Sequence, residues 1–245
     1  MSFRIDPVLN DIYRISTFSP EVGITFNQFL IVDERPALIH TGTFPMYEEV
    51  RAAIAKVMDP AKLAYVIVPH FEADECGGMT RFVQGSPKST LLCSEAGHLL
   101  NFSAWDYPGP HKGMKDGERV ELGKHKLRFL ETPHVHHWDS MMVVEETTAS
   151  LFPADLFIQP GEQPVTSSQN MGSAMCALYR GAGIFAAARP VLDVVDRVSQ
   201  MKLRWIHPMH GASLPAGSHE PYYNALRTEP FIYEGTILGR RFIAT

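Results

Sequence analysis

The sequence is poor in cysteine and contains no long hydrophobic run. Its three cysteines, Cys76, Cys93 and Cys176, are odd in number and widely spaced, which excludes a zinc knuckle or a paired redox motif. Such sparse use is typical of a reducing compartment. No stretch approaches the ~18 consecutive apolar residues of a membrane span, and the N-terminal segment MSFRIDPVLNDIYRIS lacks the apolar core of a signal peptide. We therefore expect a cytoplasmic protein with no membrane segment.

Basic runs are absent as well. The chain has 22 basic and 27 acidic residues and a net charge of −5, a balance that argues against a nucleic-acid partner. Its 245 residues are 45% hydrophobic, which suits one α/β domain with a core large enough to need no disulfides. No repeat, linker or low-complexity segment divides the chain. We expect a single domain over residues 1–245.

Hydrophobic periodicity predicts a mixture of strands and helices. Strands are predicted at residues 11–17, 25–32, 37–40, 64–68, 89–93, 118–122, 126–131, 141–145, 149–152 and 204–206. Helices are predicted at residues 44–58, 79–83, 95–100, 174–188, 191–201 and in the tail from 220. Residues 101–117, rich in proline, glycine and aromatics, are predicted to form a long loop. This mixture, in two similar halves, indicates packed sheets with helices outside.

A cluster of potential metal ligands follows the apolar strand at residues 64–68. It consists of one imidazole and three carboxylates: His70, Glu72, Asp74 and Glu75. Open α/β sheets place their ligand sites at the carboxyl ends of strands. Without a cation, so much like charge in a small volume would repel. Because thiolate is absent and carboxylate outnumbers imidazole, the cluster favours iron or manganese over a structural zinc.

Three further predicted strand ends carry residues of the same kind. They hold a histidine-rich segment, an acid and a histidine pair: His134, His136 and His137; Asp155; and His207 and His210. Taken singly, a histidine at a strand end is more often a hydrogen-bonded structural residue, and an aspartate is often a helix cap or turn residue. Four such clusters in order, each at a strand end, favour one shared metal site.

With these clusters the chain resembles the metallo-β-lactamase superfamily, and within it the diiron domain of flavodiiron proteins and their stand-alone oxygen-binding relatives. Residues 70–74 match the His-x-Glu-x-Asp core of that branch, whereas the hydrolytic branches carry His-x-His-x-Asp-His. Matching segments also lie at residues 23–32, 133–141, 151–155 and 208–211. The resemblance implies an αββα sandwich of two mixed β-sheets flanked by helices.

The resemblance also implies which residues bind two iron ions. Its register selects His136, because the family's ligand histidine stands two residues before Asp-Ser-Met, and it selects His210 over His207. The first iron would take His70, Glu72, His136 and Asp155, and the second would take Asp74, Asp155 and His210. Asp155 would bridge the two ions. Zinc or manganese is the alternative metal, and no FMN is expected in this chain.

Two residues depart from the family pattern. Glu75 stands where a histidine is usual, and His40 stands where the superfamily commonly has an acid, LIHTG in place of LIDTG. We expect Glu75 to be a further ligand of the second iron, or else an outward-facing acid at the start of the next helix. His134, His137 and His40 are candidates to donate protons or hydrogen bonds to bound oxygen, or to orient the ligands.

The resemblance implies a non-haem diiron protein that binds or reduces dioxygen or nitric oxide. No flavodoxin-like domain is apparent, so electrons would come from a separate flavoprotein or rubredoxin-like donor; a reductase and an oxygen-binding sensor both fit. The family also implies a homodimer. Two alternatives stay open: a dinuclear metal hydrolase, and a diiron oxygenase whose aromatic loop at residues 101–107 lines a substrate pocket, unless that loop is a dimer contact.

Overall fold

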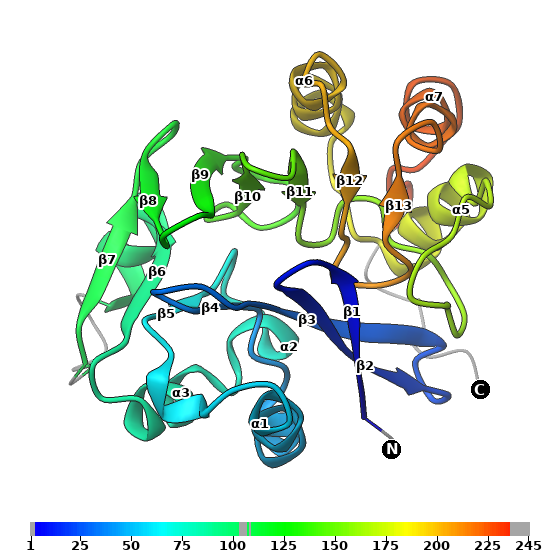
Figure 1. The fold of residues 1–245 in the computed structure, drawn as a ribbon. Helices are drawn as coiled ribbons and strands as arrows, with labels where there is room; N and C mark the ends of the chain where they lie inside the picture. Colours follow the sequence, from blue (N-terminus) through cyan, green and yellow to red (C-terminus); the bar gives the residue numbers. More distant parts are fainter. Residues whose placement is uncertain (1–2, 103–106, 108, 236–245) are drawn as a thin grey trace.

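Two mixed β-sheets face each other, and helices cover the outer face of each, in a computed structural model that describes residues 3–102, 107 and 109–235 (Figure 1). This is the predicted αββα arrangement, and the prediction is confirmed. The seven-stranded sheet runs in the order β1 (Arg4–Leu9), β2 (Ile12–Ser19), β3 (Ile24–Ile31), β4 (Ala37–Ile39), β5 (Tyr65–Ile67), β6 (Thr90–Ser94) and β7 (His111–Met114). Its first four strands are antiparallel neighbours, and β4 to β7 are parallel.

The second sheet has six strands. Their order is β13 (Leu214–Pro215), β12 (Trp205–Ile206), β11 (Ser150–Phe152), β10 (Met141–Glu145), β9 (Lys126–Glu131) and β8 (Arg119–Glu121). Among the strands that the structure describes in this sheet, only β11 and β12 pair in parallel. The core between the sheets consists of inward-facing apolar side chains from both, among them Phe29, Ile39, Ile67, Phe129 and Phe152. Alternation along each strand places these side chains on the inner face.

Helices pack on the outside because each has one apolar face. On the first sheet lie α1 (Tyr47–Ala55), which follows a 3₁₀ turn at Phe44–Met46, and α3 (Met79–Gly85). On the second lie α5 (Gly172–Ala182), α6 (Ala188–Ser199) and α7 (Glu220–Thr228). Val191, Val194, Val195 and Val198 of α6 are buried at the spacing of one helix face. No described helix has the length and apolar character needed to cross a bilayer.

Differences from the sequence prediction include three strands and several helix boundaries. The loop predicted for residues 101–117 contains β7, which pairs in parallel with β6. Its sequence, HKGM, has little hydrophobic periodicity, so the strand is identified only by its pairing with β6 at the edge of the sheet. β1 and β13 also escaped prediction. The helix predicted to run to residue 188 ends at Ala182, because Gly183 adopts a left-handed cap (φ 73°). Of the aromatic loop, residues 103–106 lie outside the described residues.

The four clusters lie at strand ends, as predicted. β5 leads into His70 and the short helix α2 (Ala73–Cys76), and residues 132–140 connect β9 to β10. β11 leads into Asp155, and β12 into the segment that holds His210. Both sheets therefore contribute to one region.

Candidate metal centre

Asp155 lies at the centre of the site, and its two carboxylate oxygens face different groups of side chains. Oδ2 lies 3.1 Å from His70 Nε2 and 3.1 Å from His136 Nε2. Oδ1 lies 3.1 Å from His210 Nε2. The side chain of Asp155 is buried. One carboxylate with an oxygen toward each of two ligand groups is the arrangement that a bridging ligand requires.

The first group is completed by Glu72. Its Oε2 lies 3.2 Å from His70 Nε2 and 3.0 Å from His136 Nε2. Nitrogen and oxygen ligands bound at about 2.1 Å around one ion are themselves roughly 3 Å apart. The atoms of His70, Glu72, His136 and Asp155 therefore already have the spacing of a coordination shell.

The second group comprises His210, Asp155 and Asp74. His210 Nε2 lies 3.3 Å from Asp74 Oδ2. Asp74 Oδ1 is buried and has no hydrogen-bond partner among the described residues. Buried carboxylate oxygens without a donor are unfavourable unless a cation satisfies them. The donor set therefore fits a second ion beside the first.

Neighbouring groups fix the orientation of the histidines and of Asp155. His210 Nδ1 lies 3.0 Å from the carbonyl oxygen of Thr25. Since a carbonyl can only accept, Nδ1 carries a proton and donates to Thr25, and Nε2 is the nitrogen that faces the carboxylates and would bind a metal. The Tyr179 hydroxyl donates to the main-chain oxygen of Asp155 (2.8 Å). Asp139 accepts from the Phe71 N–H (3.2 Å), next to His70.

The carboxylates of the site favour positive charge on the groups beside them. Burial by itself lowers the pKa of His136, but Asp155 and Glu72 raise it to about 9. In His210 burial also lowers the pKa, and Asp155 with Asp74 raises it to about 10. Burial raises the pKa of Asp155, yet the surrounding histidines hold it well below its usual range. Without a cation, protons on imidazole would balance these carboxylates, and metal binding would release them.

The other predicted site residues differ in their distance from this centre. His137 is partly exposed, with Nε2 3.9 Å from Glu72 Oε2, and its ring lies 4.7 Å from that of His70. His134 is exposed; its N–H donates to the His137 carbonyl (2.7 Å), and no contact of its side chain with the site is found among the described residues. Their predicted roles toward bound oxygen stay predictions.

His207 and Glu75 are both completely buried. His207 lies away from the two groups, with Nδ1 2.8 Å from Ser213 Oγ and Nε2 3.3 Å from Ser150 Oγ. Glu75 has no exposed surface, so the alternative of an outward-facing helix acid is wrong. Its two oxygens contact His70 and His40, and its ligation of a second metal stays a prediction.

The contacts made by three supporting groups escaped sequence reasoning. The Thr25 contact is made by a main-chain carbonyl, so the residue type at position 25 does not indicate it. Tyr179 comes from α5, 24 residues after the aspartate that it anchors. Asp139 had the only usable signal, because it belongs to the Asp-Ser-Met segment that set the register for His136.

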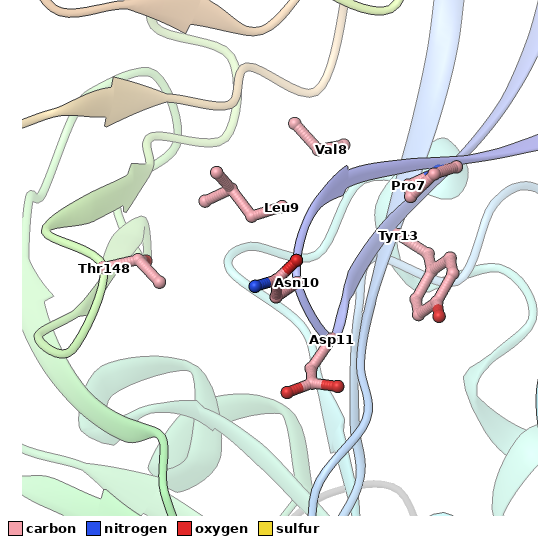
Figure 2. A pocket seen from close by; sticks show the side chains of 7 residues that line it. All are labelled: Pro7, Val8, Leu9, Asn10, Asp11, Tyr13 and Thr148. Carbon is pink, nitrogen blue, oxygen red and sulfur yellow. The ribbon is translucent and has the colours of Figure 1, made fainter.

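A separate hollow of about 700 Å³ lies at the turn between β1 and β2, facing Thr148 (Figure 2). Its lining includes no histidine and a single carboxylate, Asp11, which is paired with Lys124 (2.7 Å). It therefore offers no metal-ligating or acid–base cluster. The candidate site is the group of side chains around Asp155.

Known proteins share the fold and part of the sequence of this chain. A family model described as "ODP family beta lactamase" matches residues 24–211. A nitric oxide reductase of Moorella thermoacetica is 30% identical over 203 residues, which cover 79% of this chain and 50% of that protein. The chain thus spans about half the length of this curated relative.

Solved structures show the same fold. The rubredoxin oxygen:oxidoreductase from Desulfovibrio gigas superimposes with a TM-score of 0.81 at 23% identity, covering 91% of this chain and 60% of that one. The flavodiiron protein from Giardia intestinalis gives 0.80 at 18% identity, covering 93% and 59%.

Proposed function

Because the chain belongs to the ODP family of metallo-β-lactamase-like domains, homologous to flavodiiron protein cores, we propose that it is a non-haem diiron protein that binds or reduces dioxygen or nitric oxide. The observation that carries the proposal is the placement of Asp155, with one oxygen toward His70 and His136 and the other toward His210. This placement supports two adjacent ions that share one carboxylate.

The ligand sets follow from the contacts. The first ion would be held by His70, Glu72, His136 and Asp155 Oδ2, and the second by Asp74, His210 and Asp155 Oδ1. Bound iron would supply the electron-transfer chemistry with a diatomic ligand. The carboxylates of the site, with Glu75 included, balance the charge of two ferrous ions, which suits a partly buried site. Glu72 in place of a second histidine favours iron over the zinc of a hydrolase.

Reduction needs electrons from outside the site. The names of the similar proteins mention nitric oxide and the pair rubredoxin and oxygen. These names support dioxygen or nitric oxide as the ligand here, and a rubredoxin-like protein or a flavoprotein as the donor. A homodimer, a cytoplasmic location and a single working domain also stay predictions.

Metal analysis and oxygen chemistry test the proposal together. Protein from iron-replete growth should contain about two irons per chain. After anaerobic reduction, addition of dioxygen or nitric oxide should change the visible spectrum. Sustained gas consumption with an added flavoprotein reductase would identify an enzyme, and a reversible spectral change without consumption would identify a sensor. Zinc in the purified protein together with hydrolysis of a generic ester would contradict the diiron assignment.

Two histidine variants test the ligand register. His136→Ala removes a nitrogen 3.1 Å from Asp155 Oδ2 and should lose much of the bound iron. His134→Ala alters an exposed neighbour two positions away and should retain it. Metal content after identical purification is the measurement. If His134→Ala lost the metal and His136→Ala kept it, the proposed ligand set would be wrong.

A further inference from the structure

The two residues that depart from the family pattern are in contact with each other. His40 and Glu75 are 35 positions apart in the chain, yet His40 Nδ1 lies 3.3 Å from Glu75 Oε1, and neither side chain has any exposed surface. We propose that they form a buried pair in which Glu75 is a positioning residue for His70 and His40 holds Glu75 in that role. This inference rests on the proposed metal site for its purpose, although the contacts of the pair are between protein atoms alone.

The Glu75 carboxylate is shared between His40 and His70. Oε2 accepts a hydrogen bond from the His70 N–H (3.0 Å) and lies 3.1 Å from His70 Nδ1. His70 Nε2, on the other side of the ring, faces Glu72 and Asp155. Glu75 therefore stands behind the imidazole relative to the proposed first ion. A carboxylate in this place fixes the tautomer of a ligand histidine and increases its basicity.

The backbone around the pair holds it in register. His40 follows β4 with a left-handed backbone (φ 62°), a conformation that non-glycine residues rarely adopt. Its N–H donates to the carbonyl of Ile67 at the end of β5 (3.1 Å). Thr41 then donates to the Glu75 carbonyl through both its N–H and its hydroxyl, each at 2.8 Å. These hydrogen bonds hold the turn after β4 against α2. As a consequence, the side chains of His40 and Glu75 face each other.

Residue types at the two positions are exchanged relative to the pattern that the sequence resembles. There an acid would stand at position 40 and a histidine at position 75; here the histidine and the acid have changed places. An imidazole–carboxylate pair is kept in either order. In this chain the carboxylate of the pair lies against His70. If only one of the two positions differed from the pattern, two imidazoles or two carboxylates would stand at positions 40 and 75. The two differences are therefore best understood together.

A direct metal role for Glu75 is the competing reading. Glu75, His70 and Asp155 each offer a ligand atom within 4.8 Å of the others, so a rotation of the carboxylate would bring it toward the ions. The two roles predict different losses. If Glu75 positions His70, its removal should weaken binding of the first ion. If Glu75 is instead a ligand of the second ion, its removal should leave the second ion unbound.

Four variants separate these roles: Glu75→Gln, Glu75→His, His40→Asp and the double variant His40→Asp/Glu75→His. Cobalt(II) titration followed by visible absorption reports the number of bound ions and their affinity, with Asp74→Asn as the control for loss of the second ion. Glu75→Gln should still bind two ions, with the first bound roughly 10- to 100-fold more weakly. Selective loss of the second ion, as in Asp74→Asn, would overturn the positioning role.

Thermal unfolding of as-purified and chelator-treated protein tests the pair itself. Each single exchange, Glu75→His or His40→Asp, should lower the melting temperature, and the double variant should recover most of that loss. A double variant no better than the sum of the singles would refute the pair. Should a single exchange fail to fold, Glu75→Gln against His40→Asn gives the same comparison with smaller changes. Because this arm needs no metal, it can succeed even where wild-type protein takes up no iron and the proposed function fails.

Discussion

At the scale of single residues, two histidines three positions apart have opposite environments. His210 faces carboxylates that raise its pKa to about 10, whereas His207 is buried among rings and serine hydroxyls. Burial, together with the nearby Arg14 and His219, lowers the pKa of His207 to about 3. His207 is thus a neutral structural residue that shares its segment with a site residue. Residue type alone does not separate the two, and the family register was needed to select His210.

The low pKa of His207 predicts a loss of stability in acid. An unfolded histidine has a pKa of about 6.5, so between that value and about 3 the unfolded chain binds a proton that the native chain does not. Stability is therefore present above pH 6.5 and falls as the pH decreases through this window, by roughly 2–3 kcal/mol at pH 4.5. His207→Gln should be less stable at pH 7 but should lose less on acidification. Urea unfolding of both proteins at several pH values is the measurement; parallel pH profiles would contradict the assignment.

At the scale of elements, α5 connects the second sheet to the site. Tyr179 on its buried face holds the main chain of Asp155, and Gly172 at its start lies against α7. A Cβ at Gly172 would come within 2.7 Å of Ala225 Cβ and 2.9 Å of the Pro221 carbonyl. At Gly181, near the exposed end of the helix, a Cβ would meet no atom within 4 Å. Of these two glycines, only Gly172 therefore lies where a side chain would disturb the contact of α5 with α7.

The two glycines provide a matched test of this contact. Gly172→Ala should destabilise the protein by about 1–3 kcal/mol, because either α7 or the start of α5 must move. Gly181→Ala should stabilise it by about 0.5–1 kcal/mol, because alanine restricts the unfolded chain and favours the helix. Chemical denaturation of both variants gives the two free energies of unfolding. Equal effects would mean that the α5–α7 contact does not limit the position of α5.

At the scale of the whole molecule, Asn27 on β3 joins the two sheets beside the site. Its side chain accepts from Arg14 Nε (2.7 Å) and donates to the carbonyls of Pro208 and Gly211, on either side of His210. Arg14 is buried and also donates to the Pro164 carbonyl (2.6 Å). A buried guanidinium that loses an acceptor is costly. This network therefore holds the last histidine segment against the first sheet.

Neighbouring amides on β3 test that role. Asn27→Leu keeps the size of the side chain but removes the acceptor of Arg14 Nε and the donor to two carbonyls, and should cost about 3 kcal/mol or more. Gln28→Met is the control, since the Gln28 amide is buried without a hydrogen-bond partner among the described residues, and should change stability by less than about 1 kcal/mol. The measurement is the free energy of unfolding, with metal content recorded alongside. A costly Gln28→Met would show that packing on β3, rather than the Asn27 network, holds the sheets together.

By itself, the sequence determined the layered α/β fold, most strands and the four segments that meet at the site. These features are local, because hydrophobic periodicity and residue type are read over a few positions. β7 escaped because its pairing along the sheet edge, rather than its own composition, makes it a strand. The family resemblance, and not spacing, supplied the choice of His136 and His210.

Only the tertiary structure decided which atoms face one another. The Thr25 carbonyl orients His210 across 185 positions of the chain, and Glu75 lies against His40 and His70 rather than in solvent. Such contacts depend on how β3, β4 and the strand-end segments converge in space. No local pattern encodes them, because each atom's partner is brought to it by a different strand.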